Sequence, residues 1–119
     1  AGLKVQALSA NQAVMTCLAN DVGYDCIYAE QLAVLAEPGD LLVVLSGSGN
    51  SPNIIKAVNY AKDVGCKVLG LTGFKGGKLR DLSDIKFHIE TPEGEYGLVE
   101  DAHMILNHII FSYFVQKGS

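Results

Sequence analysis

The run LLVVLSGSGNSP at residues 41–52 gives the clearest indication of the fold. Its first five residues are all apolar, and turn-forming residues bound them on both sides. Such a run is typical of a strand that is buried on both faces, as in a parallel sheet covered by helices. The small polar residues from Ser46 to Pro52 then predict a loop that leads into the next helix.

Strands and helices alternate on either side of this stretch, which predicts repeated right-handed crossovers. We expect an α/β fold, a doubly wound three-layer α/β/α sandwich, in a single domain over residues 1–119. A flexible loop is predicted at residues 73–80, and the final helix is expected to be largely buried because apolar residues surround it. The predicted strands, about four, are residues 3–8, 41–45, 67–72 and 85–90; the predicted helices are one capped by Asn11 that runs through Leu18, and residues 27–35, 53–64 and 99–115.

The composition of the chain indicates which classes of binding partner to expect. The chain has 119 residues, 49% of them hydrophobic and 18% charged, and its formal net charge is −4. A mildly acidic chain has no general field that attracts nucleic acid or anionic lipid, so we expect neither a direct nucleic-acid partner nor a membrane. The three cysteines, Cys17, Cys26 and Cys66, match no metal or redox spacing. They are interpreted as small, buried, reduced thiols of a cytoplasmic protein.

The loop at residues 46–52 is the main candidate for chemistry. In open α/β sheets a ligand lies beyond the carboxyl ends of the strands. Glycines let the backbone approach it, a helix N-terminus favours an anion, and serine hydroxyls add neutral donors. Pro52 stands where a dinucleotide-binding loop has its third glycine, and the spacing of a Walker A loop is absent. A second interpretation stays open, in which the loop is only a tight turn that caps the helix.

The same residues resemble a known family. The runs GDLLVVLSGSGNS at 39–51, VLGLTG at 68–73 and GGKL at 76–79 resemble the SIS (sugar isomerase) family of phosphosugar isomerases and phosphosugar-binding domains. The run NDVGY at 20–24 and the final helix are most similar to the sedoheptulose 7-phosphate isomerase branch.

The resemblance implies roles for individual residues. Asp21 is expected near the sugar hydroxyls, and His108 occupies the position of a catalytic histidine. Glu100, also assigned as catalytic, stands where the branch usually carries glutamine, so it departs from the pattern. Zinc is suggested by the resemblance alone. The phosphate would be held by Ser46, Gly47, Ser48, Gly49, Asn50 and Ser51.

Three functions follow from these observations. The first is aldose–ketose isomerisation of a heptose phosphate. It requires an upstream segment with a catalytic glutamate, which the family normally has, so we expect an N-terminally truncated chain that is inactive alone. The second is a non-catalytic phosphosugar-binding or regulatory module. The third is a scaffold with a vestigial loop, held in an oligomer by the final helix. A homo-oligomer, dimer or tetramer, is expected because that helix is so apolar.

Two further groups have alternative interpretations. His103 in the final helix is interpreted as a hydrogen-bonded core residue rather than a catalytic one. Lys75, Lys78 and Arg80 either face the phosphate or form a solvated loop balanced by nearby acidic residues.

Overall fold

A parallel sheet of three strands organises the chain. The computed structural model describes residues 3–118. The strands are β1 (Leu41–Ser46), β2 (Lys67–Thr72) and β3 (Ile85–His88), in the order β1-β2-β3. The register pairs Ser46 with Thr72 and Thr72 with His88, so the carboxyl ends of the strands form one row. The predicted parallel α/β class is confirmed.

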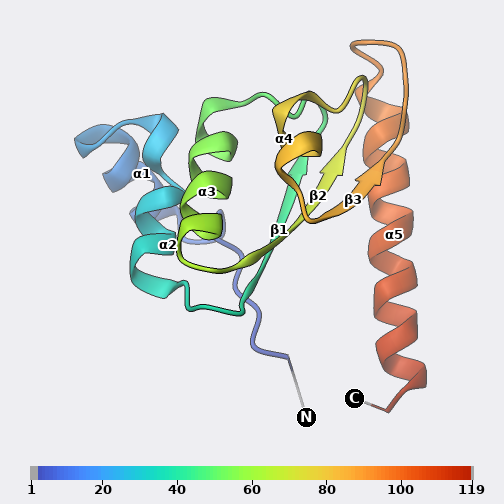
Figure 1. Ribbon diagram of the computed structural model, residues 1–119, viewed down its shortest axis with the longest axis horizontal. Coiled ribbons are helices and arrows are strands. Elements are labelled where there is room, and N and C mark those ends of the chain that lie inside the picture. Colours follow the sequence, from blue (N-terminus) through green and yellow to red (C-terminus); the bar gives the residue numbers. More distant parts are fainter. Residues whose placement is uncertain (1–2, 119) are drawn as a thin grey trace.

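Helices lie on both sides of this sheet (Figure 1). Helices α1, α2 and α3 are on one side, and α5 stands on the other. Asn11 caps the first helix as predicted, since its Oδ1 accepts from the Val14 N–H at 3.2 Å. The helices are α1 (Gln12–Asp21), η1 (Tyr24–Cys26, a 3-10 turn), α2 (Ala29–Leu35), α3 (Pro52–Asp63), α4 (Gly77–Leu82) and α5 (Tyr96–Gln116).

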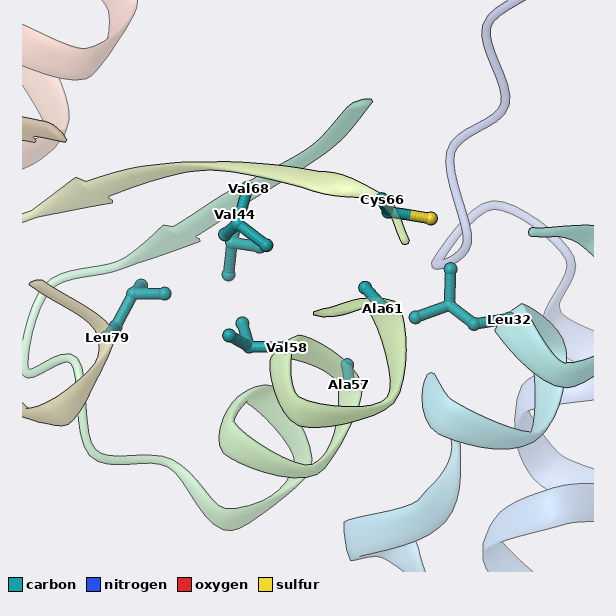
Figure 2. Close-up of a cluster of buried hydrophobic side chains, with 8 residues drawn as sticks. All are labelled: Leu32, Val44, Ala57, Val58, Ala61, Cys66, Val68 and Leu79. Carbon is teal, nitrogen blue, oxygen red and sulfur yellow. The ribbon is translucent and has the colours of Figure 1, made fainter. Parts of the chain in front are cut away.

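The hydrophobic core lies between the sheet and α3. Val44 and Val68 point from neighbouring strands towards Val58 of α3, and Leu79 of α4 closes one end (Figure 2). Val58, Val68 and Leu79 are completely buried. Burying such side chains contributes about 1.5–3 kcal/mol each. This core fixes α3 against the sheet, and with it the loop that precedes α3.

The expected strand at residues 3–8 is not formed, so the count of about four strands was wrong for residues 3–118. Residues 3–7 are exposed and have no regular structure, although their polar and apolar residues alternate. A strand needs a neighbour for its ladder of hydrogen bonds, and within the described chain β1 pairs with β2 alone.

Two expectations about burial were also wrong. Leu41, Val43 and Leu45 are 53%, 48% and 58% exposed, so β1 is buried on one face and not on both. Helix α5 is largely exposed, because Val99 and His103 are its only buried residues. Helix α5 contacts the carboxyl end of β2 and the residue after it, through His103 at Thr72 and Val99 at Gly73.

The segment from Gly73 to Arg80 is ordered structure and not the flexible loop predicted. Gly73, Phe74 and Gly76 are buried, and α4 begins at Gly77 and packs on α3 and β2. Within residues 3–118, no helix combines the length and the apolar character that crossing a bilayer requires.

The three cysteines are free, but they are not all buried as expected. Cys66 is buried, Cys26 is partly exposed and Cys17 is exposed. The Cys17 thiol donates to the Asp21 carboxylate, which raises the pKa of Cys17.

Candidate functional site: the anion loop

Residues 46–52, here called the anion loop, connect the carboxyl end of β1 to the first turn of α3. Pro52 is the first helical residue, where its missing N–H costs no hydrogen bond. The dipole of this twelve-residue helix places positive potential at the loop. The loop therefore favours a negatively charged group without carrying a basic residue itself.

The serine hydroxyls of the anion loop are oriented by the backbone. Ser46 Oγ accepts from the Gly49 N–H at 3.1 Å, and Ser48 Oγ accepts from the Asn50 N–H at 3.4 Å. A hydroxyl that accepts in this way keeps its own hydrogen for a ligand oxygen. Ser51 is the N-cap residue of α3, but its side chain makes no capping bond. The Gly49 N–H, by contrast, is already used inside the loop.

Helix α4 holds the anion loop from the side. The Leu79 N–H donates to Gly49 O at 2.9 Å, and the Lys78 N–H donates to Asn50 Oδ1 at 3.0 Å. A Cβ on Gly77 would lie 2.4 Å from Ser48 O. Sequence reasoning identified the run GGKL at 76–79 only as part of a resemblance, whereas in the structure this run packs against the anion loop. Asn50 in particular acts as a bridge between loop and helix.

An aromatic pair covers the other side of the loop. A Cβ on Gly47 would lie 3.0 Å from the ring of Tyr96, the first residue of α5. Phe74 meets the Tyr96 ring edge-on, with centroids 4.8 Å apart. Phe74 has a φ of 51°, the one positive φ at a non-glycine residue in the described chain. Such strain persists only where surrounding contacts enforce it, and here it directs the Phe74 ring towards Tyr96.

An open hollow of about 490 Å³ adjoins the start of α3. It is lined by Tyr24, Asp25, Ser51, Pro52 and Asn53. The Lys56 ammonium forms an ion pair with the Asp25 carboxylate at 2.5 Å and lowers the pKa of Asp25. The hollow therefore combines a serine hydroxyl of the anion loop with a carboxylate and a nearby cation.

Asp21 is close in sequence to this hollow but does not line it. It is the last residue of α1, is exposed, and accepts hydrogen bonds from Cys17 and from the side-chain amide of Asn20. The role of Asp21 at a sugar hydroxyl stays a prediction.

The two residues assigned to catalysis follow Tyr96 along α5. Glu100 and His108 are both exposed on α5. The ring of Tyr96 touches the loop, and His108 follows roughly 18 Å further along the helix axis, at 1.5 Å per residue. Glu100 is only about 6 Å along the axis from Tyr96. Glu100 and His108 are eight positions apart on one helix, so the structure does not bring them together at the anion loop.

Among the residues described, no three or more His, Cys, Asp and Glu side chains converge as a metal ion requires. The suggested zinc therefore does not fit a site built from these residues.

Two histidines, His88 and His103, each contact Thr72 at the end of β2, next to the anion loop. His103 is 6% exposed and its Nε2 lies 3.4 Å from Thr72 O, so its interpretation as a hydrogen-bonded core residue is confirmed. His88 Nδ1 lies 2.9 Å from Thr72 Oγ1. Burial, with a smaller effect from Arg80, lowers the pKa of His88. No sequence pattern pointed to His88, because its partner Thr72 is sixteen positions away.

Known proteins provide independent comparisons. A model of the SIS domain family matches residues 2–73. The phosphoheptose isomerase of Aliarcobacter butzleri is 40% identical over 109 residues, covering 92% of this chain and 57% of that protein. The phosphoheptose isomerase of Geobacter metallireducens is 36% identical over 117 residues, covering 98% of this chain and 60% of that protein.

Solved structures agree with these relatives. A phosphoheptose isomerase from Neisseria gonorrhoeae superposes with a TM-score of 0.87 at 31% identity, covering 93% of this chain and 61% of that one. A phosphoheptose isomerase from Francisella tularensis superposes with a TM-score of 0.80 at 34% identity, covering 87% of this chain and 55% of that one. The chain thus spans between 55% and 61% of the length of these four proteins.

Proposed function

Because the chain belongs to the SIS domain family, we propose that it supplies the phosphate-binding part of a phosphosugar isomerase. The substrate we propose is a heptose phosphate, sedoheptulose 7-phosphate, interconverted between ketose and aldose forms. The names of the relatives, phosphoheptose isomerases at 36–40% identity, support this choice of substrate.

One observation carries the proposal: the anion loop presents oriented serine hydroxyls at the N-terminus of α3. Ser46 and Ser48 each accept from the backbone, so their hydroxyl hydrogens are free to face phosphate oxygens. The helix dipole adds positive potential at the same point. Asn50 and α4 keep the loop in this shape before any ligand arrives, which lowers the ordering cost of binding.

Isomerisation requires further groups besides those that bind the phosphate. Aldose–ketose isomerisation moves a proton between adjacent carbons through an enediol, with a base, an acid and a group that stabilises the oxyanion. We assign acid–base roles to His108 and Glu100 by resemblance. Gripping the phosphate orients the sugar and supplies binding energy remote from the reacting carbons.

The separation of these groups favours a second function. His108 lies roughly 18 Å along α5 from the residue that touches the loop, so the assigned pair of His108 and Glu100 does not meet at the loop in the part of the chain that the structure describes. A phosphosugar-binding or regulatory module needs the anion loop alone. We therefore keep this module as the second candidate.

We also propose a cytoplasmic homo-oligomer. The observation in favour of association is the apolar surface of α5, where Ile105, Ile109 and Phe111 are 60%, 59% and 67% exposed. Surfaces of this kind on small domains usually mark contacts. Light scattering on the chain and on a Phe111→Glu variant tests the proposal: a variant with the same mass as the wild type would exclude a contact through Phe111.

The deciding experiment is a titration with sedoheptulose 7-phosphate, followed by amide shifts in NMR spectra. We expect saturable shifts centred on residues 46–53. A Ser48→Ala/Ser51→Ala variant is expected to bind at least about tenfold more weakly, since hydrogen bonds to a charged group contribute about 1.5–3 kcal/mol each. Ser112→Ala, an exposed serine on α5, is the matched control and is expected to bind normally.

Parallel titrations separate the candidate functions. Conversion of the sugar phosphate, followed in the same tubes by carbon NMR, supports the isomerase. Binding without conversion is expected of this chain under both functions, and turnover by a protein that also carries the catalytic glutamate then separates the isomerase from the binding module. No shift with either sedoheptulose 7-phosphate or inorganic phosphate at millimolar concentration would contradict both and leave the loop as a capped turn.

A further inference from the structure

The peptide group between Thr72 and Gly73 is hydrogen-bonded at both ends. Its carbonyl oxygen lies 3.4 Å from His103 Nε2, and its N–H donates to Gly47 O at 2.9 Å. The peptide is a rigid plane. A line of hydrogen bonds therefore runs from α5, through one peptide group, into the anion loop.

The direction of the first bond follows from its acceptor. A carbonyl oxygen can only accept, so His103 must carry its hydrogen on Nε2. Thr72 O also accepts from the Ile89 N–H at 3.0 Å, which uses the second lone pair. Because His103 is 6% exposed, loss of its donor leaves this carbonyl without a replacement partner from bulk water.

The apolar contact of α5 falls on the same peptide. A Cβ on Gly73 would lie 2.4 Å from Val99 Cγ2, so Val99 packs directly on Gly73. Val99 and His103 are the two buried residues of α5. The attachment of α5 and the orientation of this peptide therefore depend on each other.

We propose that His103 is a positioning residue that holds Gly47 of the anion loop in place through the Thr72–Gly73 peptide. Bonds in such a chain polarise and strengthen one another. Because the peptide is planar, a rotation that weakens the His103 bond also turns the Gly73 N–H away from Gly47 O. The packing of α5 on the sheet is thereby coupled to the conformation of the anion loop. A ligand that stabilises this loop conformation also stabilises the packing of α5. This last consequence rests on the proposed function; the positioning of Gly47 does not.

The test compares His103→Leu, which removes the donor, with His103→Gln, whose side-chain amide can donate to the same carbonyl. Met104→Leu, at a neighbouring exposed position on α5, is the control. The first readout is the hydrogen-exchange rate of the Gly73 amide without ligand, relative to amides in the middle of β2. We expect Leu to accelerate this exchange about tenfold, and Gln and the control to stay within about twofold of wild type. If the Leu variant does not fold, His103→Phe replaces it.

The second readout is the affinity for sedoheptulose 7-phosphate. We expect about a fivefold loss in the Leu variant and recovery in the Gln variant. The inference is overturned if Leu lowers the unfolding midpoint but leaves the relative Gly73 exchange unchanged, or if Gln accelerates Gly73 exchange as much as Leu does. If the wild type binds no sugar phosphate, the proposed function fails, and the exchange of Gly73 alone decides whether His103 positions the loop.

Discussion

A Cβ on Gly49 of the anion loop would lie 2.0 Å from the carbonyl oxygen of Gly76, just before α4. No side chain fits between these two backbones. Gly49 also has a φ of 67°, in the left-handed region that favours glycine. The anion loop is therefore shaped by a segment 27 residues further along the chain as well as by its own sequence.

Gly49→Ala is expected to destabilise the fold by more than about 2 kcal/mol, because the left-handed backbone costs about 1–2 kcal/mol and the clash adds to it. Urea unfolding measures the change. Gly39→Ala is the matched control: its φ is 94°, but no atom lies within 4 Å of the added Cβ. We expect the control to lose only the stability that the left-handed backbone costs an alanine. An equal loss of stability in both variants would contradict the close packing of the anion loop against α4.

Gly47 and Tyr96 are expected to be energetically coupled. An alanine at position 47 would place its Cβ 3.0 Å from the Tyr96 ring, which must then shift. Gly47→Ala should therefore cost more stability in the wild type than in a Tyr96→Ala background. A double-mutant cycle by urea unfolding is expected to give about 1 kcal/mol of coupling. Additive effects would mean that the ring does not rest on the loop.

Leu79→Ala is expected to lower the free energy of unfolding by about 3 kcal/mol, since Leu79 of α4 is completely buried in the core with residues of α3 and the sheet. Leu98→Ala, at a leucine that is 58% exposed on α5, should change stability by less than about 0.5 kcal/mol. Thermal and urea unfolding check both values. A similar loss in the two variants would contradict the position of the core.

Stability is expected to fall as pH drops below about 6.5, the ordinary pKa of histidine. Burial lowers the pKa of His88 in the folded chain, so the unfolded chain takes up its proton first. The contribution of neutral His88 to the free energy of unfolding is complete above the pKa of the unfolded chain. It is lost as the pH falls from that pKa towards the lower pKa of the folded chain. Urea midpoints between pH 7.5 and 5 measure this loss, and His88→Gln should make it smaller.

A direct titration of His88 provides the check on that assignment. The imidazole carbon-bound hydrogens, assigned by comparison with His88→Gln, should titrate with a pKa below 6.5. A pKa above 6.5 would show that the ring is not desolvated at Thr72 and would remove the reason for the predicted pH dependence.

Local patterns were sufficient for most elements. The apolar run before Ser46 predicted β1, and Asn11 marked the start of α1. These features depend on neighbouring residues, so a sequence window contains their cause. The position of the anion loop between β1 and α3 followed from the same reasoning.

The pattern failed where an element needs a distant partner. Residues 3–8 alternate like a strand, yet residues 3–7 are exposed and unpaired in the described chain. Helix α5 is apolar all round, which predicted burial, but Val99 and His103 are its only buried residues. Apolar character indicates what a segment can bury; it does not say whether another segment arrives to cover it.

Strand, helix and turn propensities are local, so they were enough to predict a parallel α/β unit with a serine- and glycine-rich loop at the carboxyl end of a strand. The contacts of that loop became known from the folded chain: α4 packs against the loop, Tyr96 covers Gly47, and the Thr72–Gly73 peptide joins the loop to His103. Those relationships are contacts between segments about 25 to 50 residues apart, and packing around the common core is what brings them together.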